Sequence, residues 1–364
     1  MPPRTTCWDL EPHTSAKHLI LRRYLQAWLP IMTRWNGRVL YIDGFAGPGI
    51  YRGGEEGSPI IALKEAINHT AQIRSQVIFL FIEADPARLE VLKQQIGALQ
   101  VPSNFKVQCL LGKFDEHLTQ VLDFVKEQKR DLAPTFAFVD PFGFSHTPFS
   151  LIKRLMQNDK CEVLITFMFE AINRFLAHPD QPGNYDSLFG SPDWQSAIPI
   201  EDAQARKKFI HDLYLRQLQT SAAITYVRSF EMFDTGNRPE YFLFFGTKSY
   251  DGLKKIKEAM WKADESGRFQ FSDTTDMNQS LLFQPTPDFS DLKGRIVAKF
   301  RGRRVTVDDV ERFVVIETPY RQTHFKQQVL KPMESVIPPE LRVVTRTGQN
   351  RRGTFPSGTV FDIL

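Results

Sequence analysis

Three acidic residues follow buried, strand-like runs of the sequence, where a carboxylate can accept hydrogen bonds from a ligand. Asp43 follows the run VLYI, Glu83 ends a run that begins at Val77, and Asp140 follows TFAFV. Acids at the carboxyl ends of parallel strands point into the ligand crevice of an open α/β sheet. These three residues are therefore the first candidates for chemistry.

The residues after Asp43 form a turn that suits close contact with a ligand. Its glycines let the backbone approach a bound molecule, and the small Ala46 does the same. A turn placed directly after a first strand and before a helix favours nucleotide binding over an ordinary tight turn. We expect cofactor contacts from Asp43, Gly44, Phe45, Ala46, Gly47 and Gly49.

Glu83 is expected to accept hydrogen bonds from both ribose hydroxyls of an adenosine-containing ligand. It lies 34 residues after Gly49, beyond the usual spacing of ~20. The polar loop 51–57 supplies the extra length. The alternative is that Glu83 is a helix-capping acid beside Asp85-Pro86.

The segment Gly112 to Asp115 follows the third strand and is a candidate adenine site. An acid here can hydrogen-bond the adenine amino group, and Phe114 can pack on the ring. Asp115 equally suits the N-cap of a helix that begins at Glu116. Both roles stay open from the sequence.

The segment after the fourth strand is the candidate catalytic site. The Asp140 carboxylate can accept a hydrogen bond from an exocyclic NH2 group, and the Pro141 carbonyl can accept another. Phe142 can stack on a planar base. This arrangement makes an amine lone pair more available to an electrophilic methyl group. The alternative is an Asp-Pro turn with Phe142 in the core.

The elements that must position these residues alternate regularly. Apolar strand-like runs cover 39–42, 77–82, 105–111, 135–139 and 161–169, and helical patterns cover 13–29, 58–67, 86–96, 116–126 and 149–156. Continuous apolarity means that a strand is buried on both faces. The pattern predicts a doubly wound, Rossmann-like α/β sheet.

After the fifth strand the pattern changes. We expect a loop insertion at 176–199, a helix at 201–219, a hairpin of strands 222–233 and 241–247, and a closing helix at 253–263. The predicted first domain is thus 1–263, with an insertion at about 173–220. The polar segment 264–287 is read as a linker.

The C-terminal part, 288–364, is expected to be a separate winged-helix-like domain. Three helical patterns at 289–300, 307–316 and 320–333 precede strand-like runs at 341–345 and 359–363. This part holds 14 Lys/Arg against 9 Asp/Glu, whereas the rest of the chain holds 32 against 33. The loop 346–358 predicts phosphate contacts from Arg346, Arg351 and Arg352, although an ordinary solvated turn is the alternative.

Composition limits the remaining possibilities. The chain has 364 residues, 42% of them hydrophobic, which is enough for a packed core. Its three cysteines are scattered singly, so no metal site is expected from them. No apolar run reaches the length of a membrane span, and the N-terminus has no apolar signal core. These features predict a cytoplasmic protein.

The four candidate sites, in this order, resemble the class I S-adenosylmethionine-dependent methyltransferases. Residues 45–49 are like the FAGxG motif of the amino-group nucleic-acid methyltransferases, and Asp140 to Gly143 is like their DPPY motif. The same DPFG sequence is similar to that of the tRNA guanine-N2 dimethyltransferases. Lys113 departs from the pattern, because many members have an acid there.

Nearly the whole chain also resembles the three-Cys-motif partner family. The matching features are Trp8, His13-Thr14 and Lys17, the segments 43–49 and 140–144, Glu317-Thr318, and His324 to Lys326. The resemblance implies a separate radical-S-adenosylmethionine-like partner protein, which carries the three-cysteine motif.

Together these features predict transfer of a methyl group from S-adenosylmethionine to an amino group of a DNA or RNA base, without a metal. The base must be flipped out or single-stranded. The alternative is a catalytically degenerate adaptor that brings nucleic acid to the partner. A small-molecule methyltransferase is a weaker reading, because of the basic C-terminal part. His146, Asn173 and Arg174 are further crevice candidates, and His324 is expected at the surface or facing DNA.

Overall fold

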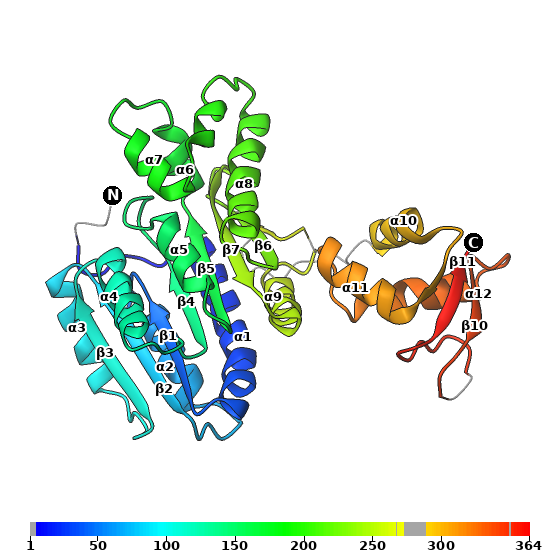
Figure 1. Cartoon of the computed structure of the whole chain (residues 1–364), viewed down its shortest axis with the longest axis horizontal. Helices are drawn as coiled ribbons and strands as arrows, with labels where there is room; N and C mark the ends of the chain where they lie inside the picture. Colours follow the sequence, from blue (N-terminus) through cyan, green and yellow to red (C-terminus); the bar gives the residue numbers. More distant parts are fainter. Residues whose placement is uncertain (1–4, 267, 273–288, 349–350) are drawn as a thin grey trace. The chain divides into compact units, whose positions relative to one another are not determined.

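The computed structural model describes residues 5–266, 268–272, 289–348 and 351–364 and contains two compact units (Figure 1). The first unit includes the chain up to Gly252 together with 270–272. The second includes 253–266, 268–269 and the described residues from 289 onward. The boundary falls inside helix α9 (Tyr250–Ala263). The predicted domain bounds, 1–263 and 288–364, stay a prediction.

The first unit is built on an eight-stranded sheet with the order β3-β2-β1-β4-β5-β7-β6-β8. The strands from β3 to β5 are parallel, whereas β7 is antiparallel to β5 and β6. The strands are β1 (Arg38–Asp43), β2 (Gln76–Glu83), β3 (Phe105–Leu111), β4 (Thr135–Val139), β5 (Cys161–Phe167), β6 (Tyr226–Phe233), β7 (Pro239–Thr247) and β8 (Gln270–Ser272). The predicted doubly wound sheet is confirmed.

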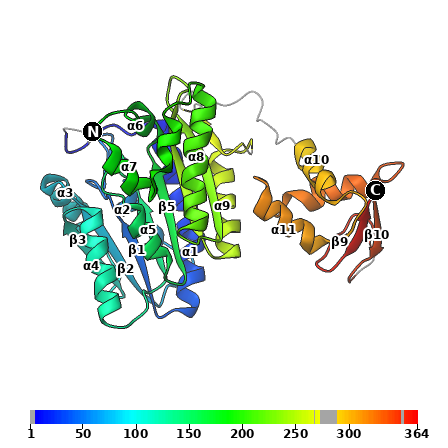
Figure 2. The same ribbon diagram turned by 45° about the horizontal axis from the view of Figure 1, so that its top comes forward.

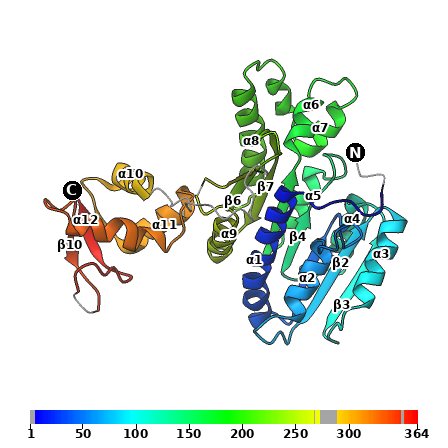
Figure 3. The same cartoon turned by 180° about the vertical axis from the view of Figure 1, so that it is seen from behind.

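Helices cover both faces of this sheet. The helices are α1 (Pro12–Trp35), α2 (Ser58–Ile67), α3 (Pro86–Gly97), α4 (Phe114–Glu127), α5 (Phe149–Met156), α6 (Phe169–Arg174), α7 (Pro182–Phe189), the 3-10 helix η1 (Pro192–Ala197) and α8 (Ala203–Thr220). Helices α4, α5, α7 and α8 enclose one apolar core with the sheet (Figure 2). Helix α1 covers the other face (Figure 3), where the rings of Tyr24 and Trp28 pack on Phe136.

The register of the parallel strands brings the candidate acids to one edge. Asp43, the last residue of β1, lies opposite Phe81 on β2 and Phe138 on β4. Glu83 and Asp140 each follow two residues later on those neighbouring strands. The three carboxylates therefore converge at the carboxyl edge of the sheet.

Two sequence expectations for this unit were wrong. Residues 176–199, expected to be a loop, contain α7 and η1, whose buried Tyr185 and Trp194 pack 4.9 Å apart. Residues 270–272, expected to be linker, form β8, which pairs with β6. Both segments are mostly polar, so their composition did not indicate that a few of their side chains are buried. The rest of the predicted linker, 273–287, lies outside the described residues.

The second unit combines short helices with a small antiparallel sheet. Its helices after α9 are α10 (Phe289–Phe300), α11 (Val307–Glu317), a π-helical turn at Lys326–Leu330 and α12 (Lys331–Ser335). The strands β9 (Arg304–Thr306), β10 (Leu341–Thr345) and β11 (Val360–Ile363) pair in the order β10-β11-β9. The sequence did not predict β9, which has only three residues.

A buried lysine joins α9 to the rest of this unit. The Lys257 ammonium is fully buried and donates to the carbonyls of Val314, Val315 and Thr318 at the end of α11. The Trp261 indole nitrogen donates to the Pro319 carbonyl at 2.8 Å. Because carbonyls at the end of a helix lack partners within the helix, α9 completes the second unit.

Within the described ranges, every helix is too short or too polar to span a bilayer.

We predict that Lys257→Met destabilises the second unit by about 3 kcal/mol, because the Val315 and Thr318 carbonyls lose the lysine donor and the Val314 carbonyl keeps only the Thr318 hydroxyl. Hydrogen exchange of the full-length chain, followed by mass spectrometry, should show faster exchange in 307–317. Lys262→Met is the matched control on the same helix, since the Lys262 side chain is 54% exposed. Unchanged exchange in 307–317 of the Lys257 variant would contradict this role.

Candidate functional site

Two adjoining cavities open at the carboxyl edge of the large sheet. The first, of about 710 Å³, lies against the ends of β1, β2, β3 and β4. The second, of about 640 Å³, lies between the glycine loop, the start of α1 and the residues after β4 and β5. Both cavities share the lining residues Phe45, Pro141, Phe142, Ala171 and Phe175. The site is thus one crevice with two compartments.

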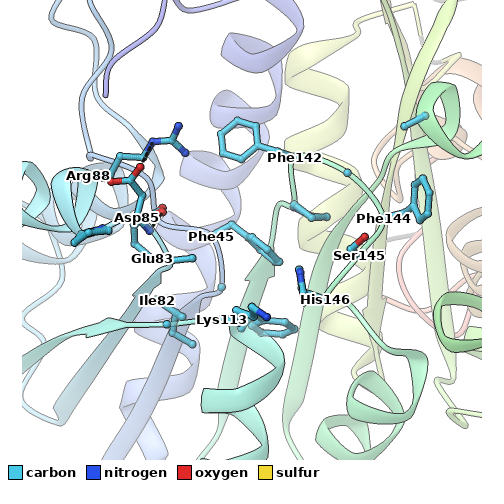
Figure 4. A pocket seen from close by; sticks show the side chains of 18 of the residues that line it. Phe45, Ile82, Glu83, Asp85, Arg88, Lys113, Phe142, Phe144, Ser145 and His146 are labelled. Atoms are coloured by element: carbon cyan, nitrogen blue, oxygen red, sulfur yellow. Dashed lines mark hydrogen bonds and ion pairs between the residues drawn. The ribbon is translucent and has the colours of Figure 1, made fainter. Parts of the chain in front are cut away.

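The lining of the first cavity is mostly apolar and also includes the charged side chains of Glu83, Asp85, Arg88 and Lys113 (Figure 4). The Phe45 ring lines it and lies 5.6 Å from the Phe114 ring. Glu83 comes from the end of β2, and Lys113 from the start of α4 (Figure 4). The compartment is shaped for a flat group that also carries polar substituents.

The glycine loop is fastened to the strands on both sides. The Gly44 N–H donates to the Phe138 carbonyl, and the Ala46 N–H donates to the Ile82 carbonyl. Gly47 has φ +63°, a left-handed conformation that favours glycine. A side chain at Gly44 would collide with Phe114, since a Cβ there would lie 2.5 Å from its ring. Gly44 is therefore required for packing.

Glu83 binds the glycine loop directly. Its carboxylate accepts from the Gly47 N–H and the Asp85 N–H, both at 2.8 Å, and the residue is 6% exposed. The helix-capping alternative for Glu83 is wrong. Asp85 is the N-cap of α3, accepting from the Ala87 and Arg88 N–H groups. Glu83 lines the first cavity, and a carboxylate has further lone pairs for a ligand.

Asp43 is fully buried beneath the loop, and one of its oxygens lacks a hydrogen-bond partner within the described structure. Burial, assisted by the nearby Asp140 and Glu83 carboxylates and opposed by hydrogen bonds from Ser58 and the Phe45 N–H, raises the pKa of Asp43 to about 7. Neither cavity has Asp43 in its lining. Asp43 therefore shapes the loop from below.

Phe114 and Asp115 lie in the first turn of α4, which begins two residues earlier than the sequence predicted. Phe114 is 1% exposed and begins α4, with Lys113 as the N-cap. The N-cap alternative for Asp115 is therefore wrong. The Asp115 carboxylate lies 3.6 Å from His146 Nδ1 and is not part of the first cavity's lining. Phe114 does line that cavity.

Asp140 is bound by a lysine that comes from α1. Lys17 Nζ donates to both carboxylate oxygens of Asp140, at 2.7 and 2.6 Å. The Lys17 side chain is 6% exposed, and its ammonium lies 5.0 Å from the centre of the Tyr241 ring. The predicted catalytic carboxylate thus already contacts a cationic amine inside the second cavity.

An aromatic cluster separates the two compartments. The Phe142 ring lies 5.2 Å from the Trp8 ring, edge to face. The Arg88 guanidinium lies over both rings, 5.1 Å from Trp8 and 5.6 Å from Phe142. Trp8 is held in place through its carbonyl, which accepts from the Arg52 N–H. The segment before α1 therefore covers the glycine loop.

The second cavity is rich in carboxylates. Glu11, Glu170 and Glu240 line it together with Asp140. Burial, followed by the charge of Glu170, raises the pKa of Glu240. His18, buried in the same wall, has its pKa lowered to about 3 by burial and by the adjacent Lys17. His18 is therefore neutral at physiological pH, and the cavity attracts cationic groups.

The other crevice candidates divide between the cavities and the protein interior. His146 lines the first cavity, and Arg174 lines the second while pairing with Glu170. The Asn173 side chain accepts from Arg206 and lines neither cavity.

The predicted arginine loop of the second unit is partly turned inward. Arg346 forms a buried ion pair with Glu334 and also donates to the Thr354 carbonyl. Arg352 donates to the Glu334 carbonyl at 2.9 Å, although the residue remains exposed. Arg351 is exposed, and no ion pair joins it to another described residue. The geometry leaves Arg351 and Arg352 as surface cations and fixes Arg346.

His324 was expected at the surface and is instead buried, at 7% exposure. Its ring packs 4.4 Å from the Trp261 ring and accepts from Arg321 Nε. Burial, followed by the charge of Arg321, lowers the pKa of His324 to about 4. The ring contact with a tryptophan explains why the surface expectation failed.

Trp8 and Lys17 belong to the sequence resemblance, which assigned neither of them a contact in the site, although a signal for Lys17 exists. Lys17 lies on the same helical face as His13 and Tyr24, which is otherwise buried. A lysine on a buried face requires hydrogen-bond acceptors, and a carboxylate is one such partner. Trp8 lies in an irregular segment and offers no comparable signal. No group of three or more metal-ligating side chains occurs among the described residues.

The large sheet is of the mixed, mostly parallel α/β kind, with β7 reversed against β5 and β6. No protein-family model matches the chain, and no curated protein matches it. Three similar solved structures are a proposed methyltransferase from Porphyromonas gingivalis W83, an O-methyltransferase from Bacillus cereus with SAH, and a human methyltransferase 10 domain-containing protein.

The similarity to these structures is distant. The identities are 11%, 13% and 12%, over 61%, 66% and 63% of this chain. The alignments span 40%, 83% and 83% of the other chains, with TM-scores of 0.28, 0.34 and 0.30. At such values they decide neither activity nor substrate.

We predict that Asp43 makes the first unit less stable as pH rises. From pH 5 to pH 8 the unfolded chain has released this proton, while the folded chain still holds it up to about pH 7. The contribution amounts to about 2–3 kcal/mol and is absent in Asp43→Asn. Urea unfolding at the two pH values, followed by tryptophan fluorescence, measures it, because four of the five tryptophans lie in this unit.

The matched control for this experiment is Asp159→Asn, because the Asp159 side chain is 97% exposed. It should keep the pH dependence of the wild type. Equal pH dependence in wild type and Asp43→Asn would show that Asp43 ionises normally.

Proposed function

We propose that the first unit binds S-adenosylmethionine and transfers its methyl group to an amino group. The observation that carries the proposal is the convergence of the glycine loop, Glu83 and the residues after β4 on one crevice at the carboxyl edge of the parallel strands. The cofactor would supply an electrophilic methyl group. Every other requirement falls on the chain's own side chains.

The residues of the first cavity suit an adenosine group. Glu83 lines the wall and retains lone pairs that ribose hydroxyls could use. Phe45 and Phe114 offer apolar faces to a planar ring. The glycine loop, with Ala46, Gly47 and Gly49, lines the second cavity, where the methionyl part would lie. Asp115, the acid expected to contact adenine, does not line this cavity, whereas Lys113 does.

Asp140 and Phe142 suit the target amine. A carboxylate that accepts a hydrogen bond from an amine orients its lone pair, and positioning of this kind supplies much of the catalysis. The Pro141 carbonyl is proposed as a second acceptor. Phe142, between the two compartments, is proposed to stack on the base that carries the amine.

We propose a nucleic-acid base as the carrier of that amine. The second unit has the element order of a winged helix, with α10, β9, α11, the α12 region and then β10 and β11. The loop between β10 and β11 carries exposed Arg351 and Arg352, which suit phosphate contacts. DNA and RNA are both compatible with this reading. A three-Cys-motif radical protein is proposed as a partner from the sequence resemblance.

The second candidate function is a catalytically degenerate adaptor for that partner. The Lys17–Asp140 ion pair favours it, because both oxygens of the candidate catalytic carboxylate already have a donor. The two functions differ in whether Asp140 is needed for the biological role.

We predict that Asp140→Ala lowers methylation of a defined oligonucleotide by about 10²–10³, as does loss of one transition-state contact elsewhere. Affinity for S-adenosylmethionine should stay unchanged, because the contact is to the substrate. Asp140→Asn should be milder, since the amide still offers an oxygen. Mass spectrometry of the digested nucleosides measures the product.

Glu231→Gln is the matched control, because Glu231 also pairs with a lysine in the same unit. It should methylate at the wild-type rate. A wild-type rate for Asp140→Ala would make the carboxylate structural. A chain that binds nucleic acid and needs no Asp140 in cells would be the adaptor.

We also predict that Arg346 and Arg351, both in the loop 346–358, respond differently to substitution. Arg351→Ala should lower the salt slope of polynucleotide binding by about one, because one phosphate contact is lost. Arg346→Ala should instead destabilise the second unit, because Glu334 loses its buried partner. Fluorescence anisotropy at several salt concentrations measures the slope. An unchanged slope in Arg351→Ala would remove this loop from the interface.

A further inference from the structure

Lys17 brings a primary amine to the carboxylate that is proposed to orient the target amine. Its Nζ lies 2.7 and 2.6 Å from the two oxygens of Asp140. Tyr241 contributes an aromatic face 5.0 Å away. Since Lys17 lines the second cavity together with Gly47 and Gly49, this amine faces the compartment assigned to the methyl donor.

The side chain is held there with little freedom. Lys17 is 6% exposed at its side chain, and it lies in the first turns of α1. Helix α1 is anchored by apolar side chains such as Ile20 and Leu21, which are fully buried. The amine is therefore a fixed part of the crevice.

We propose that Lys17 occupies the position of the substrate amine and is itself methylated by the same chain. This inference rests on the proposed function, because the methyl donor is S-adenosylmethionine. It assigns a modification site to the second cavity. Substrate and Lys17 then compete for Asp140.

The reaction balances without another co-reactant. A proton passes from the Lys17 ammonium to an Asp140 oxygen, which frees the nitrogen lone pair. The nitrogen attacks the methyl carbon, the carbon–sulfur bond breaks, and its electron pair stays on sulfur as a thioether. The products are a methylated ammonium, the demethylated cofactor and the proton, which Asp140 releases to water.

Electrostatics favour the proton transfer once the donor is bound. A sulfonium placed near an ammonium repels it, whereas a neutral amine is not repelled. The acidic side chains of Glu11, Glu170 and Glu240 line the same cavity, and acidic side chains suit a cationic donor and a cationic product. The burial of Lys17 also requires that the methyl group come from the cofactor of its own chain.

Lys207 is a matched control within the same unit. Its Nζ pairs with Glu231 at 2.6 Å and lies 5.6 Å from the centre of the Phe233 ring. The Lys207 side chain is 19% exposed, so it is at least as accessible as Lys17. It lines neither of the two cavities described above. Lys207 thus has the same chemical partners without the crevice.

The test uses the full-length chain and S-adenosylmethionine with a trideuterated methyl group. Peptide mass spectrometry measures labelled Lys17 and labelled Lys207 over time, at two protein concentrations. We expect label on Lys17 and none on Lys207, with a rate constant that does not depend on protein concentration. Asp140→Ala should reduce the labelling by at least about tenfold, and an oligonucleotide substrate should slow it.

Several results would overturn the inference. Equal labelling of both lysines would indicate non-specific alkylation, and a rate that rises with protein concentration would mean transfer between chains. An unlabelled Lys17 in a chain that methylates the oligonucleotide would refute the inference and leave the proposed function standing. Absence of cofactor binding in calorimetry would refute both. A Lys17→Arg chain that still gains label in the same peptide would place the modification elsewhere.

Discussion

The constraint on which the site depends is the meeting of three carboxylates at one edge of a parallel sheet. The register places Asp43, Glu83 and Asp140 on adjacent strands at nearly the same level. Carboxylates this close repel one another unless each one is hydrogen-bonded, paired with a cation or protonated. Backbone N–H groups bind Glu83, and Lys17 binds Asp140. Burial raises the pKa of Asp43, which lets it keep its proton.

The groups that stabilise these carboxylates come partly from segments outside the sheet. Neutralising Asp140 requires α1, whose first turns supply Lys17 and the buried His18. Holding Glu83 requires the left-handed turn at Gly47, and the loop is covered by Trp8 from the N-terminal segment. The crevice is therefore closed by residues that come before β1. A ligand that enters must replace or share these internal contacts.

The sequence predicted the parallel sheet well, because each central strand is a continuous apolar run with a helix after it. It also placed Glu83 and Asp140 at strand ends, since position along a strand is enough for that. It could not find the Lys17–Asp140 pair, whose members are 123 residues apart and meet only through the fold. It misjudged Arg346, because composition does not reveal that this residue forms a buried ion pair with Glu334. It misjudged His324 for a similar reason, since the ring packs against Trp261.

The crevice is proposed to bind S-adenosylmethionine between the glycine loop and Glu83. Isothermal titration calorimetry with the demethylated cofactor tests it most directly, comparing wild type with Gly47→Val, whose φ of +63° disfavours a branched side chain. We predict one binding site in the wild type and none in the variant, with unchanged far-ultraviolet circular dichroism. No heat of binding by the wild type at millimolar ligand, or equal affinity in the variant, would contradict the claim.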